Sequence, residues 1–217
     1  MSKETMQRIL DGKIVAIVRG ISSDKIAGLA QALADGGITC IEVTFDQSSP
    51  EKAQQTLDAI ASIRNALGDK VCVGAGTVMT EEQVQQAAQA GAEYMISPNV
   101  DERVIRATKA LGKISIPGAM TPTEVAYAYE CGADIVKMFP AGILGAGYIK
   151  AVKAPLKHIP VVAVGGVNAG NCAEFIKAGA VGVGVGGNLV SPVLVNEGRF
   201  DEITAMAQEY TNALKGV

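Results

Sequence analysis

Three charged residues lie in apolar stretches of the sequence that resemble buried β-strands. Lys137 stands inside DIVKMF, Glu42 inside CIEVTF, and Arg19 at the end of VAIVRG. Such a charge can mark an edge strand or a buried structural ion pair, but a buried pair contributes little to stability. We therefore interpret Lys137 and Glu42 as functional groups, and Arg19 as either a functional group or a residue at the rim.

Lys137 and Glu42 together could perform carbonyl chemistry. The two-residue period of a strand puts Ile135, Lys137 and Phe139 on one face. Burial of that face and a nearby Arg19 would both lower the lysine pKa and leave a neutral amine able to attack a carbonyl. Glu42 could then move protons during carbinolamine formation, dehydration and carbon–carbon cleavage. The alternative for Lys137, a point charge that binds phosphate, suits a loop residue better.

Two pairs of glycines follow apolar runs near the end of the chain. Gly165 and Gly166 follow VVAV, and Gly186 and Gly187 follow VGVGV. Backbone amides without side chains, close to the start of a helix, can bind an anion such as phosphate. Glycine also serves tight turns, so each pair alone is weak evidence, and the two together favour a phosphate site.

The segments that carry these residues repeat one pattern: an alanine-rich amphipathic stretch, a glycine, and a short β-branched run. We expect each glycine to end a helix in the left-handed conformation. The strands are predicted at 13–19, 38–45, 70–74, 94–97, 113–117, 134–139, 160–164 and 181–185. The marking glycines are Gly36, Gly68, Gly91, Gly112, Gly132 and Gly179.

Helix starts support the same division. Thr121-Pro122-Thr123-Glu124 forms a capping box, Ser49-Pro50 opens another helix, and Asp101 precedes an apolar stripe. Eight strands alternating with eight helices predict an α/β fold, a (β/α)8 TIM barrel, as one domain over residues 1–217. A doubly wound open sheet is the alternative, but the first strand is not followed by a G-x-G-x-x-G turn. A closed barrel has no edge strand, and its active site opens at the carboxyl ends of the strands.

Composition excludes several classes of protein. The 217 residues are 48 % hydrophobic and 19 % charged, with a net charge of −3 and scattered basic residues, so nucleic-acid binding is disfavoured. No apolar run approaches the roughly 20 residues of a membrane span, and the polar start predicts a cytoplasmic protein. With one histidine, His158, and no C-x-x-C pair among four cysteines, we predict no metal site.

In these residues the chain resembles the class I 2-keto-3-deoxy-6-phosphogluconate (KDPG) / 4-hydroxy-2-oxoglutarate (KHG) aldolases. The resemblance runs from about residue 13 to 190, through VAIVRG, GGITCIEVTF, VGAGTV, AGAEYMISPNV, IPGAMTPTE, VKMFPAG, VAVGGVN and GVGGNLV. It implies a homotrimeric TIM barrel of carbohydrate metabolism, the Entner–Doudoroff pathway included, that releases pyruvate and an aldehyde without a cofactor or metal.

The same resemblance assigns roles to individual residues. It makes Lys137 the Schiff-base lysine and Glu42 the acid/base residue. Thr77 and Pro98 would line the pyruvate end, Phe139 would pack beside the imine, and the glycine pairs would bind the phosphate.

Two positions depart from many members of that family. Asp46 stands where they carry an arginine for the pyruvate carboxylate, which leaves Arg19 and Thr77 as candidates, and Gly187 replaces a serine near the phosphate. The related 2-keto-3-deoxy-6-phosphogalactonate (KDPGal) aldolases also lack that arginine, so they are an alternative. Two other hypotheses are a phosphate- or flavin-binding barrel of another reaction class and a catalytically silent barrel.

Overall fold

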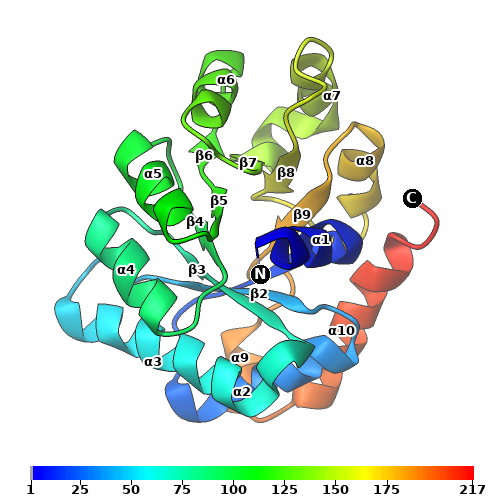
Figure 1. The fold of residues 1–217 in the computed structure, drawn as a ribbon. Coiled ribbons are helices and arrows are strands. Elements are labelled where there is room, and N and C mark those ends of the chain that lie inside the picture. The colour runs from blue at the N-terminus through cyan, green and yellow to red at the C-terminus, as the bar shows by residue number, and fades with distance from the viewer. Residues whose placement is uncertain (1) are drawn as a thin grey trace.

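The computed structural model describes residues 2–217 and, at its amino end, side chains from residue 3 onward (Figure 1). One parallel sheet forms the centre, in the order β5-β4-β3-β2-β1-β9-β8-β7-β6. The strands are β1 (Ile14–Val18), β2 (Cys40–Thr44), β3 (Cys72–Gly76), β4 (Tyr94–Ile96), β5 (Ile114–Ile116), β6 (Gly118–Ala119), β7 (Val136–Met138), β8 (Val161–Val164) and β9 (Gly182–Val185).

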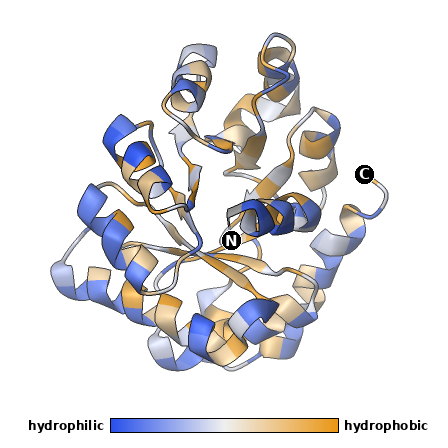
Figure 2. Cartoon of the chain, in the orientation of Figure 1, coloured by the Kyte–Doolittle hydropathy of each residue, from blue (hydrophilic) through white to orange (hydrophobic). Residues whose placement is uncertain are grey.

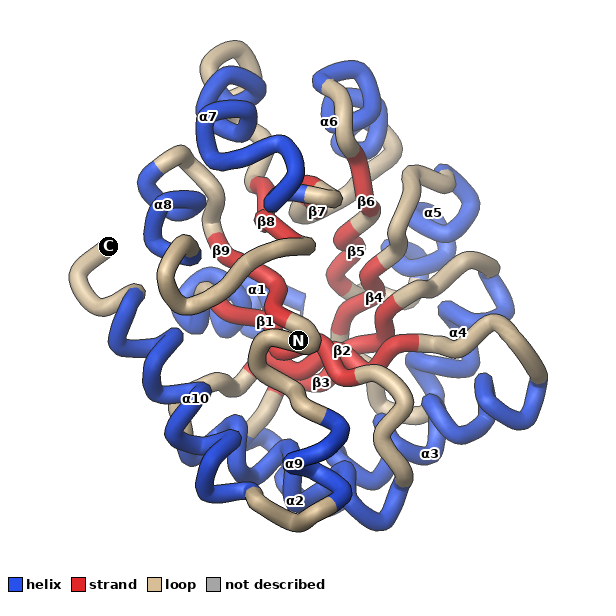
Figure 3. Tube along the Cα trace, turned by 180° about the vertical axis from the view of Figure 1, so that it is seen from behind, coloured by secondary structure: helices blue, strands red, loops and turns tan. Residues whose placement is uncertain are grey.

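A helix or helix pair follows each strand position of the barrel and covers its outer face (Figures 1 and 3). These are α2 (Ser23–Asp35), α3 (Pro50–Leu67), α4 (Glu81–Gln89), α5 (Glu102–Ala110), α6 (Pro122–Glu130), α7 (Ala141–Lys153), α8 (Cys172–Lys177), α9 (Pro192–Asn196) and α10 (Phe200–Ala213). A short 3-10 turn, η1 (Gly68–Lys70), follows α3.

The ring closes at the fifth strand position, where β5 lies within the predicted strand 113–117 and the short β6 lies just beyond it. Pro117 separates the two pieces, because proline has no N–H to give to the ladder. Asp134 N donates to Ser115 O over 3.0 Å, and Lys137 N donates to Pro117 O over 2.8 Å, so β7 pairs across the division. The (β/α)8 prediction is therefore confirmed, and the open doubly wound sheet is not what forms.

Apolar side chains fill two layers. The larger core packs the outer face of the strands against the helices, whose polar sides face outward (Figure 2). The smaller one lies inside the barrel and includes Tyr94, Ile116, Ile135 and Val162. A strand that is buried on both faces has a continuous apolar run in the sequence, and for this reason the predicted strand positions lie close to the observed ones.

The predicted caps are confirmed at three helices. Thr121 and Glu124 form the reciprocal capping box of α6, Ser49 accepts from Lys52 N at the start of α3, and Asp101 accepts from Arg103 N at the start of α5. Each cap gives a partner to an amide that the helix itself leaves unpaired.

One glycine prediction is wrong. Five of the six marking glycines have positive φ, but Gly36 has φ −79°, and the next residue, Gly37, takes the left-handed conformation at φ +88°. Gly36 is needed for packing instead, since a Cβ there would lie 2.4 Å from the Cβ of Ala207 on α10. Adjacent glycines give no sign in the sequence of which one turns the chain.

The polar first segment forms a helix, α1 (Ser2–Gly12), that lies across the amino-terminal end of the barrel (Figure 1). Its Ile9, 2 % exposed, packs with Cys40, Cys72 and Tyr94 of the inner core. No helix within residues 2–217 is long and apolar enough to cross a membrane.

Candidate active site

A cavity of about 540 Å³ opens at the carboxyl ends of the strands, opposite α1. All ten predicted site residues line it: Arg19, Glu42, Thr77, Pro98, Lys137, Phe139, Gly165, Gly166, Gly186 and Gly187. They come from loops and strands spread along almost the whole chain, and the barrel brings them to one place, as this fold does for active sites in general.

Lys137 stands on β7 with only 7 % of its surface exposed. Its Nζ lies 5.0 Å from the centroid of the Phe139 ring, and it forms no ion pair within residues 2–217. Burial lowers the pKa of Lys137, the Glu42 carboxylate raises it, and the Arg19 charge lowers it further. The net effect lowers the pKa of Lys137, so a larger fraction of the amine is neutral at a given pH than for an exposed lysine.

Glu42 on β2 is 2 % exposed and reaches into the same cavity. Burial raises its pKa above the usual carboxyl range, while the charges of Lys137 and Arg19 act in the opposite direction. Gly76 makes room for the carboxylate, because a Cβ at that position would lie 1.7 Å from Glu42 Oε1. The structure gives the Glu42 carboxylate no hydrogen bond and no ion pair with a described residue, so it remains available to a ligand.

Arg19 and Thr77 border the cavity from the ends of β1 and β3. Arg19 is exposed and forms no ion pair with the residues described here, as expected for a side chain at the rim. Thr77 has φ +55°, a left-handed conformation that is unfavourable for a β-branched residue. Such backbone strain tends to occur at functional sites and persists only where neighbouring groups hold it.

The two glycine pairs form the opposite side of the cavity. Gly165 and Gly166 both have positive φ, and Gly142 N at the start of α7 donates to Gly165 O over 2.6 Å. A Cβ on Gly166 would lie 3.0 Å from Gly142 Cα, whereas one on Gly187 would meet nothing within 4 Å. Among the residues that the structure describes, the N–H groups of Gly166 and Gly187 find no acceptor. Unpaired amides at a cavity wall are suited to bind an anion.

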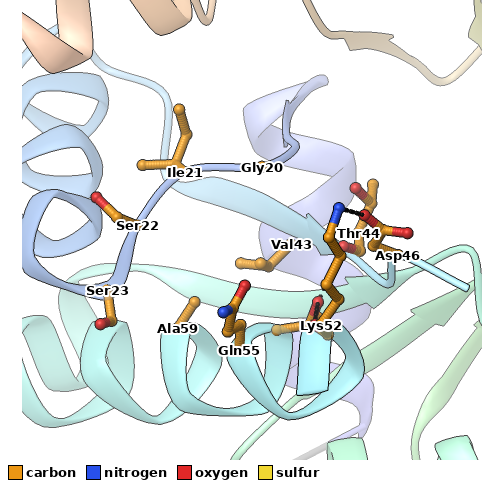
Figure 4. Close-up of a pocket in the computed structure, with 11 residues that line it drawn as sticks. Gly20, Ile21, Ser22, Ser23, Val43, Thr44, Asp46, Lys52, Gln55 and Ala59 are labelled. Atoms are coloured by element: carbon orange, nitrogen blue, oxygen red, sulfur yellow. Dashed lines mark hydrogen bonds and ion pairs between the residues drawn. The ribbon is translucent and has the colours of Figure 1, made fainter. Parts of the chain in front are cut away.

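Asp46, at the position of the expected arginine, does not line this cavity. It borders a separate cavity of about 310 Å³ between the β1–α2 loop and α3 (Figure 4). There Asp46 Oδ2 pairs with Lys52 Nζ at 2.9 Å, and Oδ1 accepts from Ser48 N. The hydrogen bond from Ser48, followed by the smaller effect of the bond from Lys52, holds the pKa of Asp46 well below its usual range.

The sequence analysis did not identify all the residues that line the active-site cavity. The cavity is also lined by Ile17, Val164, Val167, Gly184, Asn188, Val190 and Pro192. Ile17 and Val164 could have been found from strand alternation, since Arg19 and Gly166 follow them by two residues. Val190 and Pro192 lie beyond β9, in a segment whose path depends on how α9 packs.

The remaining rare residues are away from the site. His158 is exposed in a turn, with its ring 5.5 Å from that of Tyr129. Cys40, Cys72 and Cys172 are buried, Cys131 is half-buried, and all four are free thiols. Within residues 2–217 no three His, Cys, Asp or Glu side chains gather into a group that could hold a metal ion.

The fold and the cavity define a (β/α)8-barrel enzyme. A family model described as KDPG and KHG aldolase matches residues 5–206, and the chain belongs to this family, whose members are lyases. It is 37 % identical over 203 residues to the 2-dehydro-3-deoxy-6-phosphogalactonate aldolase of Escherichia coli (strain K12), covering 93 % of this chain and 96 % of that protein. It is 35 % identical over 208 residues to the 2-dehydro-3-deoxy-phosphogluconate aldolase of Treponema pallidum (strain Nichols), covering 95 % of this chain and 94 % of that protein.

A solved structure adds a chemical detail. The KDPG aldolase of Legionella pneumophila, with pyruvate captured at low pH as a covalent carbinolamine intermediate, has a TM-score of 0.83 with this chain. It is 25 % identical, and the match covers 94 % of this chain and 96 % of that one.

Proposed function

We propose that the protein is a class I aldolase that cleaves a 2-keto-4-hydroxy acid to pyruvate and an aldehyde through an imine on Lys137. The observation that carries this proposal is that Lys137 and Glu42, both buried and neither in an ion pair with a described residue, line the same cavity. The carbinolamine of pyruvate in the Legionella relative supports it. No cofactor or metal is needed for the steps that follow.

The reaction begins with the neutral amine of Lys137. It attacks the C2 carbonyl carbon, the carbonyl oxygen takes a proton, and a carbinolamine forms. Glu42 in its protonated form then delivers a proton to the carbinolamine hydroxyl, which leaves as water and gives the iminium ion. A carboxyl with a raised pKa is suited to this step because it still carries its proton at higher pH than an ordinary glutamate.

Cleavage uses the same two groups with Glu42 as the base. The carboxylate removes the proton of the C4 hydroxyl, the C3–C4 bond breaks, and its electron pair moves into the iminium to form an enamine. The aldehyde leaves, and Glu42 gives the proton it has just taken to C3, which converts the enamine back to an iminium. Water then adds to C2, gives its proton to the Glu42 carboxylate, and releases pyruvate from Lys137 as the neutral amine. Glu42 thereby alternates between acid and base, and its proton is restored at the end of the cycle.

The two ends of the cavity bind the two ends of the substrate. Arg19 and the Thr77 hydroxyl bind the carboxylate of the pyruvate moiety, with Pro98 along the same end and Phe139 packed beside the imine. The amides of the pairs Gly165–Gly166 and Gly186–Gly187 bind the phosphate of the glyceraldehyde 3-phosphate portion. A smaller keto acid that yields glyoxylate would leave this second end unfilled.

KDPG, KHG or both are the substrates that we propose, with KDPGal as the alternative. The two relatives named above, one for each phosphorylated sugar acid, are nearly equal in identity to this chain. The absence of an arginine at Asp46 favours KDPGal. We further propose a single-domain cytoplasmic enzyme of carbohydrate metabolism, with KDPG cleavage as in the Entner–Doudoroff pathway, that assembles as a homotrimer.

Pyruvate release from each pure substrate tests the proposal. The protein should release pyruvate from KDPG, KDPGal or 4-hydroxy-2-oxoglutarate, and the ratio of kcat/KM values identifies the preferred one. Failure to release pyruvate from all three would overturn the proposed reaction. Light scattering of the purified protein would test the trimer separately.

A further inference from the structure

Thr77 is held in its unfavourable conformation by one side chain from the β2–α3 loop and, through it, by one from α4. Gln47, in the β2–α3 loop, donates from Nε2 to Thr77 O over 2.7 Å. Gln83, in the first turn of α4, donates from Nε2 to Gln47 Oε1 over 2.9 Å. Gln83 Oε1 in turn accepts from Met79 N over 2.8 Å, so the chain is tied on both sides of Val78.

The backbone around Thr77 shows why this brace is needed. Gly76 O accepts from Phe45 N over 2.8 Å, and Val78 N donates to Ile96 O over 3.1 Å. The residues before and after Thr77 are therefore held by neighbouring strands, while the Thr77 carbonyl is held by the Gln47 amide. The Thr77 hydroxyl has no hydrogen bond to any residue that the structure describes and borders the cavity.

The β2–α3 loop, which carries Gln47, contributes no charged side chain to the cavity. Asp46 pairs with Lys52 in the separate cavity of Figure 4. The residue at the expected arginine position therefore does not line the cavity in which we propose that the substrate binds. The next residue, Gln47, is instead connected to the pyruvate end through Thr77. A precisely placed hydroxyl then matters more, because Arg19 is exposed and has no ion-pair partner among the described residues to fix its side chain.

We propose that Gln47 and Gln83 are positioning residues, which hold Thr77 so that its hydroxyl meets the carboxylate of the keto acid. This rests on the proposed function, in which that carboxylate binds beside Lys137. Neither glutamine lines the cavity, so both act through Thr77.

The test uses borohydride trapping of the imine with two carbonyl compounds, pyruvate and acetone, which has no carboxylate. In Gln47→Ala the pyruvate concentration for half-maximal trapping should rise about two- to tenfold, as expected for one lost hydrogen bond. Trapping of acetone should not change. Gln85→Ala is the control, because Gln85 is exposed on α4 and has no side-chain hydrogen bond within the described residues.

A double-variant cycle distinguishes a positioning role from a general loosening of the loops. In a Thr77→Val background, Gln47→Ala should have no further effect on pyruvate trapping. An equal effect in both backgrounds, an equal effect on acetone, or no effect beyond that of Gln85→Ala would overturn the inference. Absence of any pyruvate adduct in the unaltered protein would instead overturn the proposed function.

Discussion

Lys137 and Glu42 perturb one another without forming an ion pair, and this determines which protonation states the site can use. Burial shifts the pKa of each group in the direction that favours its neutral form, and the charge of the other group partly offsets that shift. Because the two titrations are coupled, a pH profile reports the pair rather than either residue alone.

The first prediction concerns the pH dependence of imine formation. Since the neutral amine reacts and the pKa of Lys137 is lowered, the trapping rate with pyruvate should rise with pH along a limb that ends below about 10.4, the ordinary lysine pKa. At higher pH the rate should fall, because ionised Glu42 no longer carries the proton that dehydration of the carbinolamine needs. The Glu42 carboxylate raises the Lys137 pKa, so Glu42→Gln should move the rising limb to lower pH. A rate that still increases through pH 10.4 would contradict the buried-amine account.

The second prediction concerns turnover. Glu42→Gln removes the proton-transfer group but keeps its shape, so kcat should fall by roughly 10²–10⁴-fold. Steady-state pyruvate release measures this, and thermal unfolding checks that the barrel remains folded. Near-normal turnover would remove Glu42 from the mechanism.

At the scale of single residues the sequence located the charged side chains that line the cavity, because charges in apolar strands are rare and conspicuous. Lys137 and Glu42 could be found from the two-residue period of a strand and from the rule that the active site of a barrel opens at the carboxyl ends of its strands. Gln47 and Gln83 were not found, because a glutamine in a polar loop looks like any solvent-exposed residue. Their role depends on the φ of Thr77, which no local sequence pattern specifies.

At the scale of elements, the loops after β8 and β9 contribute glycine backbone to the end of the cavity where we propose that phosphate binds. They differ in how much substitution they tolerate. A side chain at Gly166 would be strained by its positive φ and by Gly142, whereas Gly187 has open space around it. Gly187 therefore permits a test of the amides that leaves the loop conformation intact.

The third prediction is that Gly187→Val raises KM for a phosphorylated keto acid about tenfold or more, the loss of roughly 1.4 kcal/mol of binding. KM for 4-hydroxy-2-oxoglutarate should change much less, because this substrate has no phosphate. Gly147→Val is the matched control, since a Cβ at Gly147 also meets nothing within 4 Å and this residue does not line the cavity. Equal losses on both substrates would mean that Gly187 serves packing.

Elements were predictable where one strong signal marked each boundary, as at the capped helices α3, α5 and α6. Prediction failed at Gly36 because two glycines are adjacent, and long-range packing against Ala207 decided between them. The short β6 was also missed, because it follows Pro117, beyond the predicted strand 113–117, and is defined by its pairing with β7.

At the scale of the whole molecule, the two ends of the barrel differ. Helix α1 covers one end (Figure 1), and the cavity opens at the other. This cover was not predicted, because α1 is polar overall and few of its side chains contact the interior. Among the described side chains of α1, Ile9 is the buried member of the inner core, at 2 % exposure, and Met6 packs beside it partly buried.

The fourth prediction tests that packing. Ile9→Ala should lower the free energy of unfolding by about 2–5 kcal/mol, the usual cost of such a truncation in a core. Urea unfolding measures it, with Gln7→Ala, an exposed change on the same helix, as the control. Because α1 lies opposite the cavity, kcat should be unaffected. A loss below 1 kcal/mol would show that α1 is not part of the folded core.

The central claim is that Lys137 alone forms the covalent imine. Other lysines lie in polar helices, in loops or at strand starts, while Lys137 is buried at the open end of the barrel. Borohydride added with pyruvate should fix one three-carbon adduct, which peptide mass mapping places on Lys137. Lys137→Ala should abolish both the adduct and turnover in a protein that remains folded. An adduct on a different lysine, or turnover retained without Lys137, would contradict the account.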